Sequence, residues 1–321
     1  MDPWYWLPSG VSWRDFESRP DLPMPESDLM YRSIGAGVLV LLIRMCFHCA
    51  LGLPLATWLG LNRSKRGFVA DCFRIAIYGL PVKSRLHKFI DTFWRFAFYV
   101  FSFSYGMWYI THMCWYQDFI HCWHMYPQHP LVPYVRYHYM IEAAYYWSAL
   151  CVTLGTPSRK DFQINLVHHL VTLALLWLSW TLNLVRVGSL VLVIHDVADI
   201  FLESGKMANY VPGCETLCNV IFALFIIVWC VSRLMVYPSL IYSAIFEGPL
   251  MVPSIHWPVM IVVLYAMLCL LQVLHVIWTT MIYRMVVNTL QPSGRVEDVR
   301  SDSEQSECEQ DSNGSNGKNG S

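Results

Sequence analysis

Long apolar segments separated by short polar stretches run through most of this chain. A helix needs about twenty largely apolar residues to cross a lipid bilayer, and about seven segments approach that length. The pattern therefore predicts an all-α, polytopic membrane protein with about seven transmembrane helices. The candidate spans are residues 34–61, 93–115, 137–155, 163–183, 187–203, 216–238 and 257–283.

The composition agrees with a membrane protein, because 55% of the residues are hydrophobic and only 14% are charged. Soluble domains carry about 25% charged residues. The formal net charge is −1 and the sequence has no broad basic surface pattern, so no nucleic-acid partner is expected. The 11 cysteines are scattered, mostly in apolar segments, which predicts buried, reduced thiols rather than a disulfide framework or a zinc site.

Charge divides the chain into five parts. An acidic N-terminal segment, residues 1–33, precedes the first span at 34–61, and a basic link at 62–87 follows it. Lysine and arginine are enriched in cytoplasmic loops, so the link is predicted to be cytosolic and the N-terminal segment to lie across the membrane. The apolar body at 88–290 leads into a polar, acidic tail at 291–321, which is predicted to be cytosolic and disordered.

Two serines in this tail are candidate phosphorylation sites. Ser301 and Ser306 each have an acidic residue three positions later. An acid-directed kinase would add negative charge at both positions.

Five ionisable residues interrupt the fourth and fifth apolar segments: His168, His169, His195, Asp196 and Asp199. Ionisable groups inside hydrocarbon are costly unless they face the protein interior or water and find partners there. Such a cluster predicts a functional site.

The spacing of these residues places them on shared helix faces. Residues three and four apart lie on one face of a helix, so His168 and His169 share a broad face with Asn165, and His195 shares one with Asp199. The fourth segment leaves the predicted cytosolic side and the fifth returns to it. Both polar faces are therefore expected at the same depth, in the cytosolic half of the membrane.

Histidine next to a carboxylate is a common arrangement for proton or acyl transfer. Three alternatives stay open: a metal site, a proton relay in a transporter, and a purely structural polar network. Membrane desaturases and hydroxylases carry more histidines in repeated clusters, so no metal is expected here. The remaining histidines lie singly among aromatic residues and are interpreted as structural or interfacial; they include His112, His121, His124 and His275.

The motifs around this cluster resemble those of the ceramide synthases, a family with the TRAM-Lag1-CLN8 (TLC) fold. The resemblance extends over roughly residues 85–305 and is strongest in the Lag1 motif at 159–210. Its segments there are RKDF at 159–162, HHLVT at 168–172, RVG at 186–188, HDVAD at 195–199 and LESGKMANY at 202–210. Similar stretches outside it are KFIDTFWRFAFYV at 88–100 and VEDVRSDSE at 296–304.

The resemblance implies a multi-pass enzyme of the endoplasmic reticulum membrane with a lumenal N-terminus, a cytosolic C-terminus and six helices in a TLC-type bundle. It implies N-acylation of a sphingoid base by a fatty acyl-CoA, without a cofactor. His168 and His169 correspond to the essential histidine pair of the motif, and His195, Asp196 and Asp199 to its second polar cluster.

The resemblance also bears on substrates and partners. Arg159 and Lys160, at the predicted cytosolic mouth, are candidates for binding the phosphates of CoA, although basic residues are common beside membrane spans. The family associates acyl-chain selectivity with the region between the last two spans, here about 239–256. Many animal members carry a homeobox-like segment where this chain has only the link at 62–87, which is too short for a three-helix domain, so DNA binding is not implied.

Two questions stay open at this stage. A homo- or heterodimer with family members is one oligomeric state that the sequence allows. The same fold also includes lipid-binding and translocon-associated members without catalysis, and a non-catalytic member is the alternative reading of this chain.

Overall fold

The computed structural model describes residues 2–26, 28–61, 85–155, 162–252 and 258–290. Within these ranges every regular element is a helix and no β-strand occurs. This confirms the all-α prediction. Residues 62–84 of the basic link, the start of the Lag1 motif with Arg159 and Lys160, and the tail with Ser301 and Ser306 lie outside the described residues, while the last three residues of the link begin α5.

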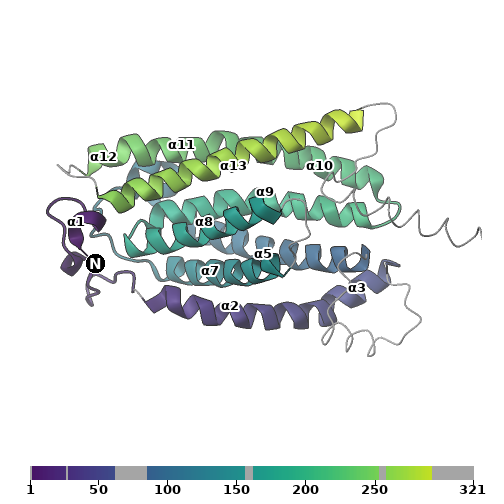
Figure 1. Cartoon of the computed structure of the whole chain (residues 1–321), viewed down its shortest axis with the longest axis horizontal. Coiled ribbons are helices and arrows are strands. Elements are labelled where there is room, and N and C mark those ends of the chain that lie inside the picture. The colour runs from purple at the N-terminus through teal and green to yellow at the C-terminus, as the bar shows by residue number, and fades with distance from the viewer. Residues whose placement is uncertain (1, 27, 62–84, 156–161, 253–257, 291–321) are drawn as a thin grey trace, which may run out of the picture.

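The long helices form a bundle whose axes run side by side (Figure 1). Helix α2 packs against α7, α7 against α8, and α8 against α13, while α5 packs against α9 and α9 against α10. Their bounds are α2 Asp28–Phe47, α5 Arg85–Ile110, α7 Pro133–Leu154, α8 Phe162–Thr181, α9 Val185–Tyr210, α10 Glu215–Trp229 and α13 Val259–Leu290.

Two of these helices continue through segments with wider turns. Helix α2 runs on through η2 (His48–Gly52) into α3 (Leu53–Trp58). Helix α10 runs on through η4 (Cys230–Val236), α11 (Tyr237–Tyr242), η5 (Ser243–Glu247) and α12 (Gly248–Met251). The region at 239–256, expected to connect the last two spans, is therefore helical as far as Met251.

Among the described residues, four helical segments are long and apolar enough to cross a membrane: Asp28–Trp58, Phe162–Thr181, Glu215–Met251 and Val259–Asn288. The other long helices, α5, α7 and α9, bury ionisable residues such as Asp91, Glu142 and Asp196, which lowers their hydropathy. Helices α5 and α9 have 26 residues each, about 39 Å at 1.5 Å per residue. The multi-pass architecture is clear, and the count of seven spans stays a prediction.

Helix α9 is longer than the expected span at 187–203. Its extension to Tyr210 includes Lys206, whose side chain forms an ion pair of 2.8 Å with Glu203, the last residue of the expected span. Arg95 of α5 also pairs with Glu203, at 3.0 Å. These ion pairs compensate the charges, so polar residues that end the hydropathy signal do not end the helix.

Residues 2–26 and 118–131 close one end of the bundle. In Figure 1 the N-terminal segment lies at the end opposite to the C-terminal end of α13. The Trp180 indole donates a hydrogen bond to the Glu26 carbonyl at 2.8 Å. Asn183, in the turn between α8 and α9, donates to the carbonyl of Pro127 at 2.8 Å. Leu7 is almost fully buried against the same end. Short helices occur there: α1 Pro3–Trp6, η1 Trp13–Phe16, α6 Cys114–Gln117 and η3 Phe119–Cys122.

The cysteines differ partly from the expectation of buried thiols. Those that the structure describes are free, as expected. Only Cys122 and Cys218 among them are buried, however, and four are exposed on the bundle: Cys46, Cys114, Cys151 and Cys269. An apolar surface in contact with lipid accepts a thiol as readily as a protein core does.

The contact between α7 and α9 yields a prediction about stability. A Cβ atom added at Gly188 would lie 1.7 Å from the Tyr139 hydroxyl, so Gly188→Ala forces two buried helices apart. Overpacking of this kind costs about 1–3 kcal/mol. We expect a melting temperature lower by several degrees in detergent. Gly35→Ala is the matched control, because nothing lies within 4 Å of its Cβ position; equal melting of both variants would contradict the prediction.

Candidate active site

A cavity of about 380 Å³ lies among α2, α5, α7, α8, α9, α10 and α13. It is at the end of the bundle where α5 begins and α9 and α13 end, away from the N-terminal segment. Its polar lining includes Asn165, His168, His169 and Asp199. The two polar faces expected from helical spacing therefore do meet in one site.

His168 and His169 are the central groups of this cavity. Their ring centroids are 5.6 Å apart, and neither imidazole has a hydrogen bond to another described side chain or backbone group. Because both lie about six residues from the start of α8, they are roughly 10 Å inside the bundle end. The two rings are therefore accessible from the cavity while water has limited access to them.

Aromatic rings hold the histidine pair in position. The Tyr146 ring of α7 lies 6.2 Å from His168 and 5.9 Å from His169, centroid to centroid. The Trp278 ring of α13 lies 5.3 Å from His168 at an interplanar angle of 82°. Such edge-to-face contacts fix ring orientation without using a ring nitrogen. The nitrogens stay available for a reacting group.

Asp199 reaches the same cavity and is held by a buried arginine. Arg233 Nη2 is 3.3 Å from Asp199 Oδ2 and also donates to the His195 carbonyl at 2.7 Å. The other Arg233 nitrogen, Nη1, is 3.1 Å from His275 Nε2. The guanidinium also lies over the Trp229 ring, at 5.2 Å. This pairing offsets the charge of Asp199.

His195 lies beside this pair but does not line the cavity. Its Nδ1 is 2.6 Å from the carbonyl oxygen of Val191. A carbonyl can only accept, so Nδ1 carries the hydrogen and Nε2 keeps its lone pair when the ring is neutral. Its ring contacts Tyr237 and His275, at 5.1 and 5.0 Å. His195 lines a smaller, apolar pocket of about 40 Å³ instead.

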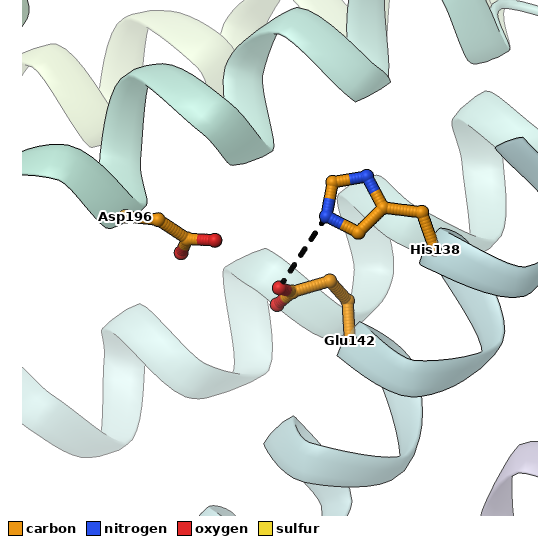
Figure 2. A group of neighbouring side chains, drawn as sticks. All are labelled: His138, Glu142 and Asp196. Atoms are coloured by element: carbon orange, nitrogen blue, oxygen red, sulfur yellow. Dashed lines mark ion pairs between the residues drawn. The ribbon is translucent and has the colours of Figure 1, made fainter. Parts of the chain in front are cut away.

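Asp196 points away from the histidine pair. It is fully buried on the face of α9 that packs against α5 and α7, where His138 and Glu142 are its neighbours (Figure 2). Its spacing groups it with His195, the preceding residue, and with Asp199, three residues further on. The packing of α9 against its neighbours is what places Asp196 outside the cavity that Asp199 lines.

An ion network occupies the part of the cavity nearest the bundle end. Asp91 pairs with Arg44 and, at 2.7 Å, with Arg95, which also pairs with Glu203. Lys206 completes the network on Glu203. Five basic and three acidic side chains line the cavity as a whole, a surplus of positive charge.

Sequence reasoning missed two residues that line the cavity, Arg233 and Trp278, which lie on later helices, far from the motif in sequence. A basic residue within an apolar segment is a signal for Arg233, since an unpaired charge there is costly. No pattern indicates the place of Trp278. His275 does not line the cavity and is buried beside Arg233, with its Nε2 3.1 Å from Arg233 Nη1.

A bundle of membrane-crossing helices around a buried, histidine-lined cavity defines a class of integral membrane protein with an intramembrane reaction or binding site. The sequence matches the family described as "TLC domain" over residues 88–284. The match includes the histidine pair, Asp199 and Arg233.

Similar curated proteins carry one description. The chain is 34% identical to "Ceramide synthase hyl-1" of Caenorhabditis elegans, over 93% of this chain and 82% of that protein. It is 33% identical to human "Ceramide synthase 5", over 96% of this chain and 87% of that protein, and 32% identical to human "Ceramide synthase 3", over 94% and 86%. The chain therefore belongs to the TLC-domain family and, within it, to the ceramide synthases, which confirms the resemblance of its motifs.

The buried pair of Arg233 and Asp199 yields a second prediction. Arg233→Met removes a positive charge that pairs with Asp199, and breaking a buried ion pair by removing one partner costs about 3–5 kcal/mol. We expect a strong loss of thermal stability for this variant, measured in detergent. The double variant with Asp199→Asn removes both charges and is expected to recover at least about 1 kcal/mol. Additive losses in the double variant would contradict the coupling.

Proposed function

We propose that this protein transfers a fatty acyl group from acyl-CoA to the amine of a sphingoid base, giving ceramide or dihydroceramide. The supporting observation is the cavity lined by two imidazoles whose Nδ1 atoms have no hydrogen-bond partner, in a chain of the ceramide synthase family. No cofactor takes part in this proposal, and acyl-CoA is the co-substrate. A non-catalytic lipid-binding role has no comparable use for two histidines without hydrogen bonds.

The cavity suits one soluble and one membrane-held substrate. Its positive charge surplus favours the phosphates of CoA at the bundle end, because charge-assisted hydrogen bonds to phosphate are strong. Lys206 and Arg284 line it there, and Arg159 and Lys160 in the adjoining segment stay candidates for the same role. The acyl chain would then extend along apolar side chains deeper in the cavity, which include Phe222, Phe225 and Trp229.

The small pocket beyond His195 connects this proposal with chain selectivity. Ala244, from the region at 239–256, lines it together with Leu264 and Leu268. Ser243 accepts a hydrogen bond from the Trp123 indole at 3.2 Å, which holds this part of the helix. The region at 239–256 therefore contributes to the wall of this small pocket. An acyl chain that passes His195 would enter the pocket.

The chemistry requires a base and has two routes. In the direct route His168 removes a proton from the sphingoid ammonium, the free amine attacks the thioester carbonyl, and the C–S bond breaks as CoA leaves with a proton. In the covalent route an imidazole nitrogen attacks the carbonyl first, the C–S bond breaks, and CoA leaves with the ring proton. The sphingoid ammonium loses one proton to the second histidine, the free amine attacks the acyl-imidazole, and the C–N bond to the ring breaks as the ring nitrogen takes the remaining amine proton.

Asp199 and its partner set the electrostatics of either route. We assign Asp199 to binding the ammonium or hydroxyl groups of the sphingoid base, with Arg233 holding the carboxylate in place. His169 supports His168. His195 and Asp196 are on α9 but do not line the cavity, so they act only through the position of that helix. Exclusion of water would protect an acyl-imidazole from hydrolysis.

The family and the charge pattern support a proposal about the cellular location of the protein and its orientation in the membrane. We propose a multi-pass protein of the endoplasmic reticulum with its N-terminus in the lumen and the cavity mouth facing the cytosol, where acyl-CoA is available. A homo- or heterodimer with family members stays an expectation.

Activity measurements on purified variants test the function. Wild-type protein with sphinganine and a panel of acyl-CoAs is expected to form N-acyl product, measured by mass spectrometry. His168→Ala and Asp199→Ala are expected to lose about 10²–10⁴-fold in rate while still inserting into membranes. The control His112→Ala lies near the opposite end, where His112 is exposed and its Nδ1 contacts the Trp108 carbonyl. Unimpaired product formation by either cavity variant would refute the assignment.

A trapping experiment distinguishes the two routes. Wild-type protein mixed with acyl-CoA alone and quenched within milliseconds is expected to carry an acyl group on a histidine if the covalent route operates. Intact-mass and peptide analysis would locate it, and His168→Ala would lack it. Rapid product formation without any acylated enzyme would select the direct route.

A further inference from the structure

A second polar cluster lies inside the bundle, separate from the cavity. His138 and Glu142 are four residues apart on α7, and Asp196 faces them from α9 (Figure 2). The three side chains are 0%, 0% and 1% exposed. Each offers one ligand atom within 4.8 Å of the other two, and none of the three lines the cavity.

The hydrogen bonds in this cluster leave two oxygens unused. His138 Nε2 is 3.7 Å from Glu142 Oε1. The Ser102 hydroxyl of α5 donates to Glu142 and also lies 3.1 Å from His138 Nε2. Glu142 Oε2 and Asp196 Oδ2 are fully buried and have no hydrogen-bond partner. Buried carboxylate oxygens without partners require an explanation, and a bound ion is one that fits two carboxylates facing each other.

The charges of the cluster are also unbalanced. Among the described residues, no lysine or arginine forms an ion pair or hydrogen bond with Glu142 or Asp196. Arg233 already pairs with Asp199, one turn further along α9. Two carboxylates without a counter-charge are very costly in an apolar interior. A divalent cation would make the site neutral.

The surroundings of His138 suit a metal ligand. Its Nδ1 is 2.8 Å from the hydroxyl of Tyr109 on α5. Histidines that bind a metal through one nitrogen commonly donate the other N–H to an acceptor, which fixes the tautomer and the ring orientation. With Nδ1–H donated to Tyr109, the lone pair of Nε2 faces the two carboxylates. The Gly106 backbone leaves room for the ring, because a Cβ there would lie 2.9 Å from its Cε1 atom.

We propose that His138, Glu142 and Asp196 bind a zinc ion that ties α7 to α9, with the Ser102 hydroxyl or a water as the fourth ligand. One imidazole and two carboxylates suit zinc in a tetrahedral site. Magnesium and calcium favour six or more oxygen ligands, which this cluster does not offer. Ligand bonds of about 2.0–2.1 Å place the ligand atoms roughly 3.3 Å apart, so binding tightens the cluster slightly.

This site differs from the metal site weighed for the Lag1 motif. The expectation that no metal binds concerned His168, His169, His195 and the aspartates, and the zinc site shares only Asp196 with that set. The ion would be structural, since none of its three ligands lines the cavity at the histidine pair or the smaller pocket beside His195. It would hold the faces of α7 and α9 together behind the active site. The site does not depend on the proposed acyltransferase activity.

Metal analysis of the purified, full-length protein tests this proposal. An affinity tag without histidines avoids metal carried over from purification. Inductively coupled plasma mass spectrometry is expected to find about one zinc per chain in the wild type. Glu142→Gln and His138→Asn are expected to hold less than about a tenth of that amount. Their matched controls, Glu26→Gln and His112→Asn, change exposed residues and are expected to keep the zinc, as is His168→Ala.

A second measurement uses the wild type alone, in case the variants fail to fold. A strong chelator is expected to lower the melting temperature in detergent by several degrees, and added zinc is expected to restore it. Wild-type protein with less than about a fifth of a zinc per chain, and no response to the chelator, would overturn the proposal. Glu142 and Asp196 would then share a proton instead. Zinc retained at full occupancy by folded Glu142→Gln would overturn the assignment to these residues.

Discussion

A charged side chain inside an apolar bundle must find its counter-charge within the protein, and this constraint organises the structure around α9. The helix carries His195, Asp196, Asp199 and Glu203 within three turns. Each carboxylate meets a different neighbour. Glu203 pairs with Arg95 and Asp199 pairs with Arg233, while Asp196 faces His138 and Glu142 of α7. Helix α9 therefore lies at the centre of the bundle, because only there can it reach α5, α7 and α10 together.

This arrangement gives the two ends of the bundle different properties. The N-terminal segment and the loop before α7 cover one end with indole and amide hydrogen bonds to backbone carbonyls. The other end contains paired charges around a cavity. Ion pairs can open and reform around an anionic substrate at lower cost than a packed core can, so the asymmetry suits a site that admits one substrate from water and another from lipid.

Within the described part of the chain, no carboxylate is hydrogen-bonded to either ring of the histidine pair. Ring contacts with Tyr146 and Trp278 orient the two rings instead. An imidazole held by its faces and edges keeps both nitrogens available, which suits a group that either accepts a proton or carries an acyl chain for a moment. Asp199 lines the same cavity, with its carboxylate held by Arg233, and this agrees with the proposal that it holds the amine.

The sequence by itself determined the helical membrane class, the family and the importance of the fourth and fifth segments, because hydropathy and costly polar residues are local signals. Helical spacing also predicted that His168, His169 and Asp199 share a site. Only the tertiary structure decided that Asp196 lies outside the cavity and that Arg233 and Trp278 line it. Adjacent residues on a helix point about 100° apart, so which neighbour each one meets depends on the packing of distant segments. The tertiary structure also decided the length of α9, because Glu203 pairs with Arg95 of α5.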